Sequence, residues 1–193
     1  GNVNITDQAY VDALDFMVEN AKADYTPADS LATAATESQE LFTNGKTAMQ
    51  LNWSHQYPAA VAVLGADKVG CAPMIGGSAG IGATTGPWYQ CVMKNSENKE
   101  MAEKYVKFMY DHNGDYMDLT LKIAGRTSVY EAAGKVAGNE HTTAVLETLS
   151  APQSQARPMV TTWSQIEEVL IGVVESSLGG ADVNATLEAA KAE

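Results

Sequence analysis

The sequence has little positive charge. It contains 12 Lys and Arg residues against 24 Asp and Glu, which gives a formal net charge of -12 over 193 residues. Nucleic-acid phosphates and anionic membrane surfaces bind concentrated Lys and Arg. The composition therefore argues against a nucleic-acid partner and against adsorption to an anionic bilayer. It favours a protein that meets neutral small molecules.

Long hydrophobic runs and cysteines are also scarce. No run of about 20 apolar residues occurs, so no membrane-spanning helix is predicted. The polar start after Gly1 lacks a signal-peptide pattern and indicates a mature or trimmed segment. The two cysteines, Cys71 and Cys91, lie in apolar runs. Two buried free thiols are favoured, but a disulfide stays open if the two runs form neighbouring strands.

Motifs for metal binding and catalysis are missing. His55, His112 and His141 are scattered, without the spacing that metal ligands show. There is no nucleophile elbow, P-loop or dinucleotide fingerprint. The sequence therefore predicts no metal, no cofactor and no enzymatic activity. Among the 24 carboxylates, a pair that meets across a cleft, as in a glycosidase, stays open.

Helical periodicity accounts for most of the chain. The spacing of apolar residues predicts helices over residues 6–21, 54–65, 96–112, 115–124, 128–137, 140–149, 164–178 and 182–192, and one that ends at Asn44-Gly45. Within 96–112, the predicted buried stripe comprises Met101, Tyr105, Phe108 and Met109, and the predicted ion pairs are Glu100–Lys104 and Glu103–Lys107. Ser164-x-x-Glu167 has the spacing of a capping box, and Gly179-Gly180 is a stop signal. In 6–21, the predicted stripe is Tyr10, Leu14, Met17, Val18 and Ala21.

Three short segments have the pattern of β-strands: residues 46–52, 69–74 and 88–94. Between the last two, residues 75–87 are rich in glycine and almost uncharged. That stretch is either a long mobile loop or a loop whose backbone approaches a ligand closely. Helices that alternate with few strands predict an α/β or α+β class with helix in excess, and the α/β class is preferred.

Aromatic and amide side chains gather in the predicted loops. The candidates for ligand binding are Trp53, His55, Trp88, Tyr89, Arg126 and Trp163. Gln56 and Arg157 have similar polar side chains in the same group of segments. Sugar rings stack their C–H faces on flat aromatic surfaces, and amide and guanidinium groups bind the hydroxyls. A place in the core accounts equally well for each Trp.

An ordered series of short motifs carries a resemblance. Phe42-x-x-Gly45-Lys46-x-Ala48-Met49 is followed by Trp53, then by Ala72-Pro73, Asn95-Ser96-x-Asn98-Lys99-x-x-Ala102, Gly125-Arg126, Arg157-Pro158 and Trp163. In order and approximate spacing this resembles the family 1 extracellular solute-binding proteins of sugar ABC transporters, the maltose-binding-protein-like group.

The resemblance implies a type II periplasmic-binding-protein fold, in which two α/β lobes close on a ligand by a hinge. It implies that Trp53 forms an aromatic wall, although Trp53 follows Ala48-Met49 sooner than in maltose-binding protein. The loop through Trp88, residues 125–128 and Trp163 would face the ligand. It further implies a carbohydrate ligand, non-catalytic delivery to ABC permease subunits, and an extracytoplasmic location in the periplasm or as a lipoprotein.

The resemblance covers only the C-terminal half of such a receptor. On this basis residues 1–75 form a second-lobe segment, residues 76–130 the crossing segment and first-lobe helices, and residues 131–193 the C-terminal helices. Apolar surface exposed by the truncation would invite a dimer. Two alternatives stay open: a glycan-active enzyme with Glu or Asp near Trp53 and Trp88, and a helix-rich interaction domain with its three Trp residues in one core.

Overall fold

The computed structural model describes residues 4–28, 33–133 and 139–192. The chain divides into two compact units, and each is described by itself. The terminal unit comprises Gly1–Ser38 and Pro158–Glu193, and the central unit comprises Gln39–Arg157. The boundary between them falls within helix α2 (Ala35–Thr43).

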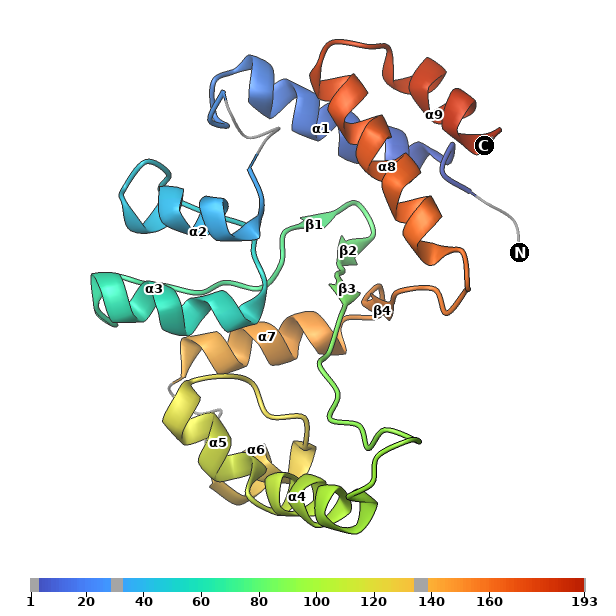
Figure 1. The fold of residues 1–193 in the computed structure, drawn as a ribbon. Coiled ribbons are helices and arrows are strands. Elements are labelled where there is room, and N and C mark those ends of the chain that lie inside the picture. The colour runs from blue at the N-terminus through green and yellow to red at the C-terminus, as the bar shows by residue number, and fades with distance from the viewer. Residues whose placement is uncertain (1–3, 29–32, 134–138, 193) are drawn as a thin grey trace. The chain divides into compact units, whose positions relative to one another are not determined.

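In the described part of the terminal unit, three helices pack together: α1 (Gln8–Lys22), α8 (Trp163–Leu178) and α9 (Val183–Lys191). They lie side by side, blue against orange and red in Figure 1. Each helix turns an apolar stripe toward the others, because residues three and four apart share one face. The resulting core comprises Ile5, Val11, Leu14, Val173, Val183 and Leu187.

The ends of these helices follow local rules. Asp182 Oδ1 accepts a hydrogen bond of 2.8 Å from the backbone N–H of Ala185, which caps the start of α9. Gly179 ends α8, and Gly180 adopts a φ of 102°, a conformation that favours glycine. The predicted stop signal is confirmed. The predicted capping box is wrong, because α8 begins at Trp163 after Thr162 and Ser164 already lies inside its first turn.

The stripe predicted for α1 is partly wrong. Leu14 is buried and Val18 half-buried, as predicted, but Tyr10 and Met17 are exposed. Val11, which was not in the predicted stripe, is buried instead. The packed face of α1 is therefore rotated around Leu14 relative to the prediction.

The central unit also consists mainly of helices. Besides the end of α2 it contains a 3-10 turn, η2 (Ser54–Gln56), and the helices α3 (Tyr57–Leu64), α4 (Lys99–Asp111), α5 (Asn113–Thr120), α6 (Thr127–Ala133) and α7 (Glu140–Ser150). A small core of Met117, Ala124 and Tyr130 joins α5 to α6. Tyr130 satisfies its buried hydroxyl by donating to the Ala124 carbonyl at 2.6 Å. The helices predicted from periodicity are thus confirmed in position, although residues 134–137 of the predicted 128–137 helix lie outside the described residues.

The strands of the central unit are short and lie in the glycine-rich stretch. β1 (Gly76–Gly77) pairs antiparallel with β2 (Gly80–Ile81), and β3 (Thr84–Thr85) pairs parallel with β4 (Gln155–Ala156). A Cβ on Gly76 would lie 2.7 Å from the Gly80 carbonyl carbon, so glycine permits the hairpin. At Gly76 the close backbone approach is to Gly80 and Ile81 of the same hairpin.

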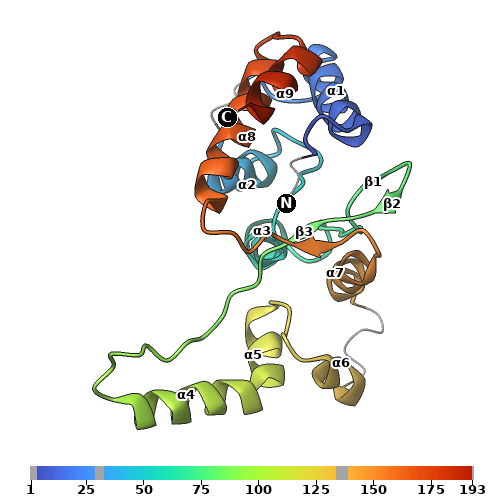
Figure 2. The ribbon, with the colours of Figure 1, turned by 90° about the vertical axis from the view of Figure 1, so that its right-hand side faces the viewer.

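The three strands predicted at residues 46–52, 69–74 and 88–94 are wrong, since none of these segments is a strand. A strand needs a partner for its backbone N–H and C=O groups, and alternation of side chains does not supply one. Figures 1 and 2 both show the segment between β3 and α4 running without a neighbouring strand.

The buried stripe predicted for α4 is also wrong. No residue of α4 is buried; Met101, Tyr105 and Phe108 are exposed, and Met109 is half-buried. Of the predicted ion pairs, Glu100–Lys104 is confirmed at 2.7 Å. Lys107 pairs with Asp111 at 2.6 Å instead of Glu103.

The cysteines are free thiols, as favoured by the sequence. Cys71 is half-buried and Cys91 is exposed, so the prediction that both are buried is wrong. Burial raises the pKa of the Cys71 thiol, and the carboxylate of Glu140 raises it further. Both effects favour the protonated and less reactive form of Cys71.

Over the described residues, no helix combines the length and the apolar character needed to cross a membrane.

Candidate functional site

Hydrogen bonds between side-chain amides hold the segment before Trp53 in the central unit. Trp53 directly precedes η2, and its backbone N–H donates to Asn52 Oδ1 at 2.8 Å. Asn52 Nδ2 donates to Gln50 Oε1 at 3.2 Å, and Gln50 Nε2 donates to Gln39 Oε1 at 2.8 Å. This chain of amides anchors the segment that leads to Trp53.

The Trp53 ring lies against two segments distant in sequence. A Cβ built on Gly86 would lie 3.2 Å from both Cη2 and Cζ3 of Trp53, so the backbone of Gly86 passes close to the ring edge. The guanidinium carbon of Arg157 lies over the ring, 5.6 Å from its centroid, within the range of a cation–π contact. The indole is 40% exposed, so part of its surface stays open to solvent.

His141 fixes the turn that follows Trp53. Its ring stacks on Tyr57 with centroids 4.2 Å apart and planes 13° from parallel. Its Nε2 lies 3.1 Å from the Ser54 carbonyl oxygen; since a carbonyl only accepts, Nε2 carries the proton and donates. His141 is 4% exposed, and this burial lowers its pKa, while the bond to Ser54 acts in the opposite direction. His55 lies within the same turn and is exposed.

Trp88 and Tyr89 follow Gly86 on the segment without strand partners. They are 91% and 79% exposed, so most of each ring faces solvent. Because Trp53 and Trp88 are both exposed, the three tryptophans do not share one core. The alternative of a helix-rich interaction domain, which expects all three Trp residues in one core, is therefore not supported.

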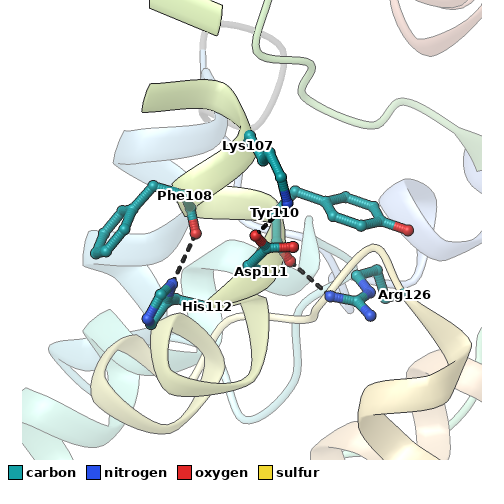
Figure 3. A network of polar contacts seen from close by, with 6 residues as sticks. All are labelled: Lys107, Phe108, Tyr110, Asp111, His112 and Arg126. Atoms are coloured by element: carbon teal, nitrogen blue, oxygen red, sulfur yellow. Dashed lines mark hydrogen bonds and ion pairs between the residues drawn. The ribbon is translucent and has the colours of Figure 1, made fainter. Parts of the chain in front are cut away.

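Arg126 packs on the C-terminal end of α4 (Figure 3). Its Nη1 donates to the Tyr110 carbonyl at 2.7 Å, and its guanidinium carbon lies 4.3 Å from the centroid of the Tyr110 ring. A cation is stabilising there, because the last carbonyls of a helix lack intrahelical partners. The guanidinium thus has a structural role at this helix end.

The same network includes Asp111 (Figure 3). Its pKa is held below the usual range, chiefly by the hydrogen bond from Lys107, with smaller contributions from the positive charges of Lys107, Arg126 and His112. Nδ1 of His112 lies 2.9 Å from the Phe108 carbonyl oxygen, and the His112 and Phe108 rings stack 4.1 Å apart. These contacts join the end of α4 to the start of α5.

Trp163 belongs to the terminal unit, where it is the first residue of α8. Its side chain is half-buried, and its Nε1 is buried without a hydrogen-bond partner in the described part of the chain. The other predicted site residues belong to the central unit. Within that unit, the structure brings Trp53 and His55 together on one turn.

Sequence reasoning missed Gly86 and His141. His141 lies 87 residues from Ser54, and no motif or spacing connects the two positions. Gly86 was noted only as one glycine of a glycine-rich stretch. No local pattern distinguishes it from the other glycines, because only the folded chain brings it into contact with the Trp53 ring.

A cavity of about 200 Å³ lies elsewhere in the central unit. It is lined by Met117, Asp118, Leu121, Asn139 and Thr142. The Thr142 hydroxyl is buried and lacks a hydrogen-bond partner among the described residues. None of the predicted site residues lines this cavity.

A family comparison covers more than half of the 193 residues. The model of the bacterial extracellular solute-binding proteins matches residues 2–115, a range that contains Trp53, His55, Trp88 and Tyr89, but neither Arg126 nor Trp163. Members of this family bind solutes outside the cytoplasm for transport, generally without catalysis, and work with ABC transporters. The helix-rich architecture with few strands is consistent with part of a periplasmic-binding-protein fold. The chain belongs to the bacterial extracellular solute-binding protein family.

Proposed function

We propose that this protein binds a carbohydrate, a mono- or oligosaccharide, and presents it to the permease subunits of an ABC importer without chemical change. The observation that carries the proposal is the partly exposed Trp53 indole on a turn anchored by side chains. A flat ring held at the surface suits the C–H face of a sugar.

The groups around Trp53 support a polyhydroxylated ligand. Arg157 contributes a guanidinium group over the ring, and His55 an imidazole on the adjoining turn. Such donors and acceptors bind hydroxyl groups beside an apolar wall. Hydrolysis of a glycosidic bond instead needs two carboxyl groups that flank it. The groups described here favour binding over the glycan-active alternative.

Trp88, Tyr89, Arg126 and Trp163 complete the proposed ligand set. Exposed Trp88 and Tyr89 follow the segment that passes Trp53 at Gly86. Arg126 uses Nη1 for the Tyr110 carbonyl, and a guanidinium has further N–H donors for a ligand. Trp163 has a buried Nε1 without a partner in the described chain, and a ligand hydroxyl would satisfy it.

The same proposal assigns three segments of the chain to parts of a two-lobe receptor. Residues 1–75 form a second-lobe segment, residues 76–130 the crossing segment with first-lobe helices, and residues 131–193 the C-terminal helices of a maltose-binding-protein-like receptor. The exposed stripe of α4 supports this assignment, because a first-lobe helix covers a sheet with such a stripe. The location is the periplasm or, with a lipid anchor, the cell surface of a bacterium. The net charge of -12 supports a partner other than nucleic acid.

Calorimetric titration with a panel of mono- and oligosaccharides tests the proposal. We expect saturable binding of at least one sugar and a loss of about tenfold or more in affinity for Trp53→Ala, since one stacked aromatic ring contributes about 1.4 kcal/mol or more. Tyr25→Ala is the matched control, because it removes an exposed aromatic ring from the terminal unit. Binding that survives Trp53→Ala would contradict the assigned wall. No binding of any sugar would overturn the carbohydrate assignment.

A further inference from the structure

We propose that Gly86 and His141 are positioning residues for Trp53: together they set the orientation in which the indole meets the solute. The inference deepens the proposed function and rests on it for the identity of the solute. It rests on the geometry alone for the orientation of the ring.

Gly86 determines where the edge of the indole can lie. A Cβ at this position would be 3.2 Å from two ring carbons of Trp53, Cη2 and Cζ3. Ordinary carbon–carbon contacts are about 3.5–4.0 Å, so a Cβ at residue 86 requires a shift of a few tenths of an ångström, which we expect the partly exposed ring to make. Gly86 has no positive φ that would strain an L-residue. The consequence of a substitution is therefore the contact itself.

His141 determines where the backbone after Trp53 can lie. Its Nε2–H donates to the carbonyl of Ser54, the residue directly after Trp53. The stack on Tyr57 holds the imidazole in the plane that this bond requires. Because the imidazole is 4% exposed, a broken bond leaves a buried polar atom without a partner. The turn at residues 54–56 is thus fixed from α7.

The two contacts act on neighbouring residues, the side chain of Trp53 and the main chain of Ser54. Gly86 limits the ring edge, and His141 anchors the main chain at the next residue. A binding site that is held in its bound geometry avoids the entropic cost of ordering the side chain on binding. The affinity for the solute therefore depends on both positions, although we assign neither a contact with the solute.

Indole resonances in a ¹⁵N–¹H correlation spectrum provide a direct measurement on the complete chain. The protein has three Trp residues and hence three indole N–H signals, of which Trp53→Phe identifies one. We expect Gly86→Ala to shift the Trp53 signal and to weaken saccharide binding by about threefold to tenfold, which corresponds to about 0.7–1.4 kcal/mol. Gly77→Ala is the matched control, because a Cβ there meets nothing within 4 Å.

Two substitutions test His141. His141→Ala removes both the stack and the donor, so it should shift the Trp53 signal and weaken binding. His141→Gln keeps an N–H donor at a similar reach and should restore most of the affinity. A role in overall stability alone predicts that both variants lower the melting temperature and that neither moves the Trp53 signal selectively.

The outcomes separate this inference from the function on which it rests. If Gly86→Ala and His141→Ala leave the Trp53 signal where it is in the wild type, the positioning role is overturned, whatever the protein binds. A shifted signal with unchanged affinity in a protein that binds sugar also overturns it. If the wild type binds no saccharide, the carbohydrate assignment fails, while the indole signals still decide whether the two residues position Trp53.

Discussion

The terminal unit and helix α4 both carry apolar stripes at helical spacing, but only the terminal unit buries them. In α9, Leu187 is 1% exposed and belongs to a core shared with α1 and α8. In α4, Met101 is 67% exposed, and no residue of the helix is buried. The comparison teaches that an apolar stripe in the sequence predicts a helix and its apolar face. It does not predict which other element packs on that face.

The difference has energetic consequences. Burial of a Leu side chain contributes about 1.5–3 kcal/mol, which the terminal unit obtains at several positions. Helix α4 has two exposed i,i+4 ion pairs instead, Glu100–Lys104 and Lys107–Asp111, and solvent screening makes such pairs contribute far less than a buried Leu side chain. The folding free energy should therefore respond strongly to changes in the first region and weakly to changes in the second.

The largest effect is expected at the core of the terminal unit. Leu187→Ala removes a fully buried side chain and should lower the free energy of unfolding by about 2–5 kcal/mol, because a cavity remains. Met101→Ala in α4 is the matched control and should change it by less than about 0.5 kcal/mol. Urea denaturation followed by circular dichroism measures both. Similar losses for the two variants would contradict the contrast between the regions.

Helix capping should show a smaller contrast. Asp182→Ala removes the side chain that caps α9 and should cost about 1 kcal/mol in the same denaturation experiment. Asn98 occupies the corresponding position before α4 but makes no side-chain capping bond. We therefore expect Asn98→Ala to cost only a few tenths of a kcal/mol. A larger loss for Asn98→Ala than for Asp182→Ala would reverse the comparison.

Helix α7 differs from both regions, because it buries two polar side chains, His141 and Thr142. Burial lowers the folded-state pKa of His141, so below the ordinary value of about 6.5 the unfolded chain binds more protons than the folded chain. The contribution to stability is present above that pH and is lost as the pH falls through the lowered pKa. We expect it to be modest, because the hydrogen bond to Ser54 opposes the effect of burial.

Stability measured between pH 8 and pH 5 checks this prediction. His141→Gln should reduce the loss of stability on acidification. Of the titratable groups near the His141–Tyr57 stack, Tyr57 and Cys71 have raised pKa values and stay protonated over this range, and the carboxylate of Glu140 precedes His141 in α7. Glu140→Gln is therefore the control for a carboxylate contribution. An unchanged pH profile in His141→Gln would exclude His141 as the source.

The smallest effect on folding is expected on the exposed face of α4. Replacing Met101 and Tyr105 together by Gln should change the free energy of unfolding by less than about 0.5 kcal/mol, because both side chains are exposed. The same variant should weaken self-association in sedimentation velocity, if the apolar face mediates the dimer that the sequence resemblance implies. A strongly destabilised double variant would show that α4 packs more tightly than its exposure indicates.

Long periodic segments were predictable from the sequence, because a helix satisfies its backbone hydrogen bonds within itself. The predicted helix at 140–149 corresponds to Glu140–Ser150, and the one at 182–192 to Val183–Lys191. The pairing of β3 with β4 was not predictable, because the two strands lie far apart along the chain: Thr84 pairs with Gln155. Of the candidate site, local sequence indicated Trp53 as an aromatic residue at the end of the segment that contains Ala48-Met49.

The sequence by itself determined the helices, the stop of α8 at Gly179-Gly180, the negative net charge and the motif series of the solute-binding family. Those properties depend on residues that are close along the chain. Only the tertiary structure decided that Gly86 meets the Trp53 ring, that His141 bonds to Ser54, and that the apolar stripe of α4 stays exposed while Val183 and Leu187 of α9 are buried. Each of these outcomes depends on which distant surfaces come together, and packing between distant segments has no local signature.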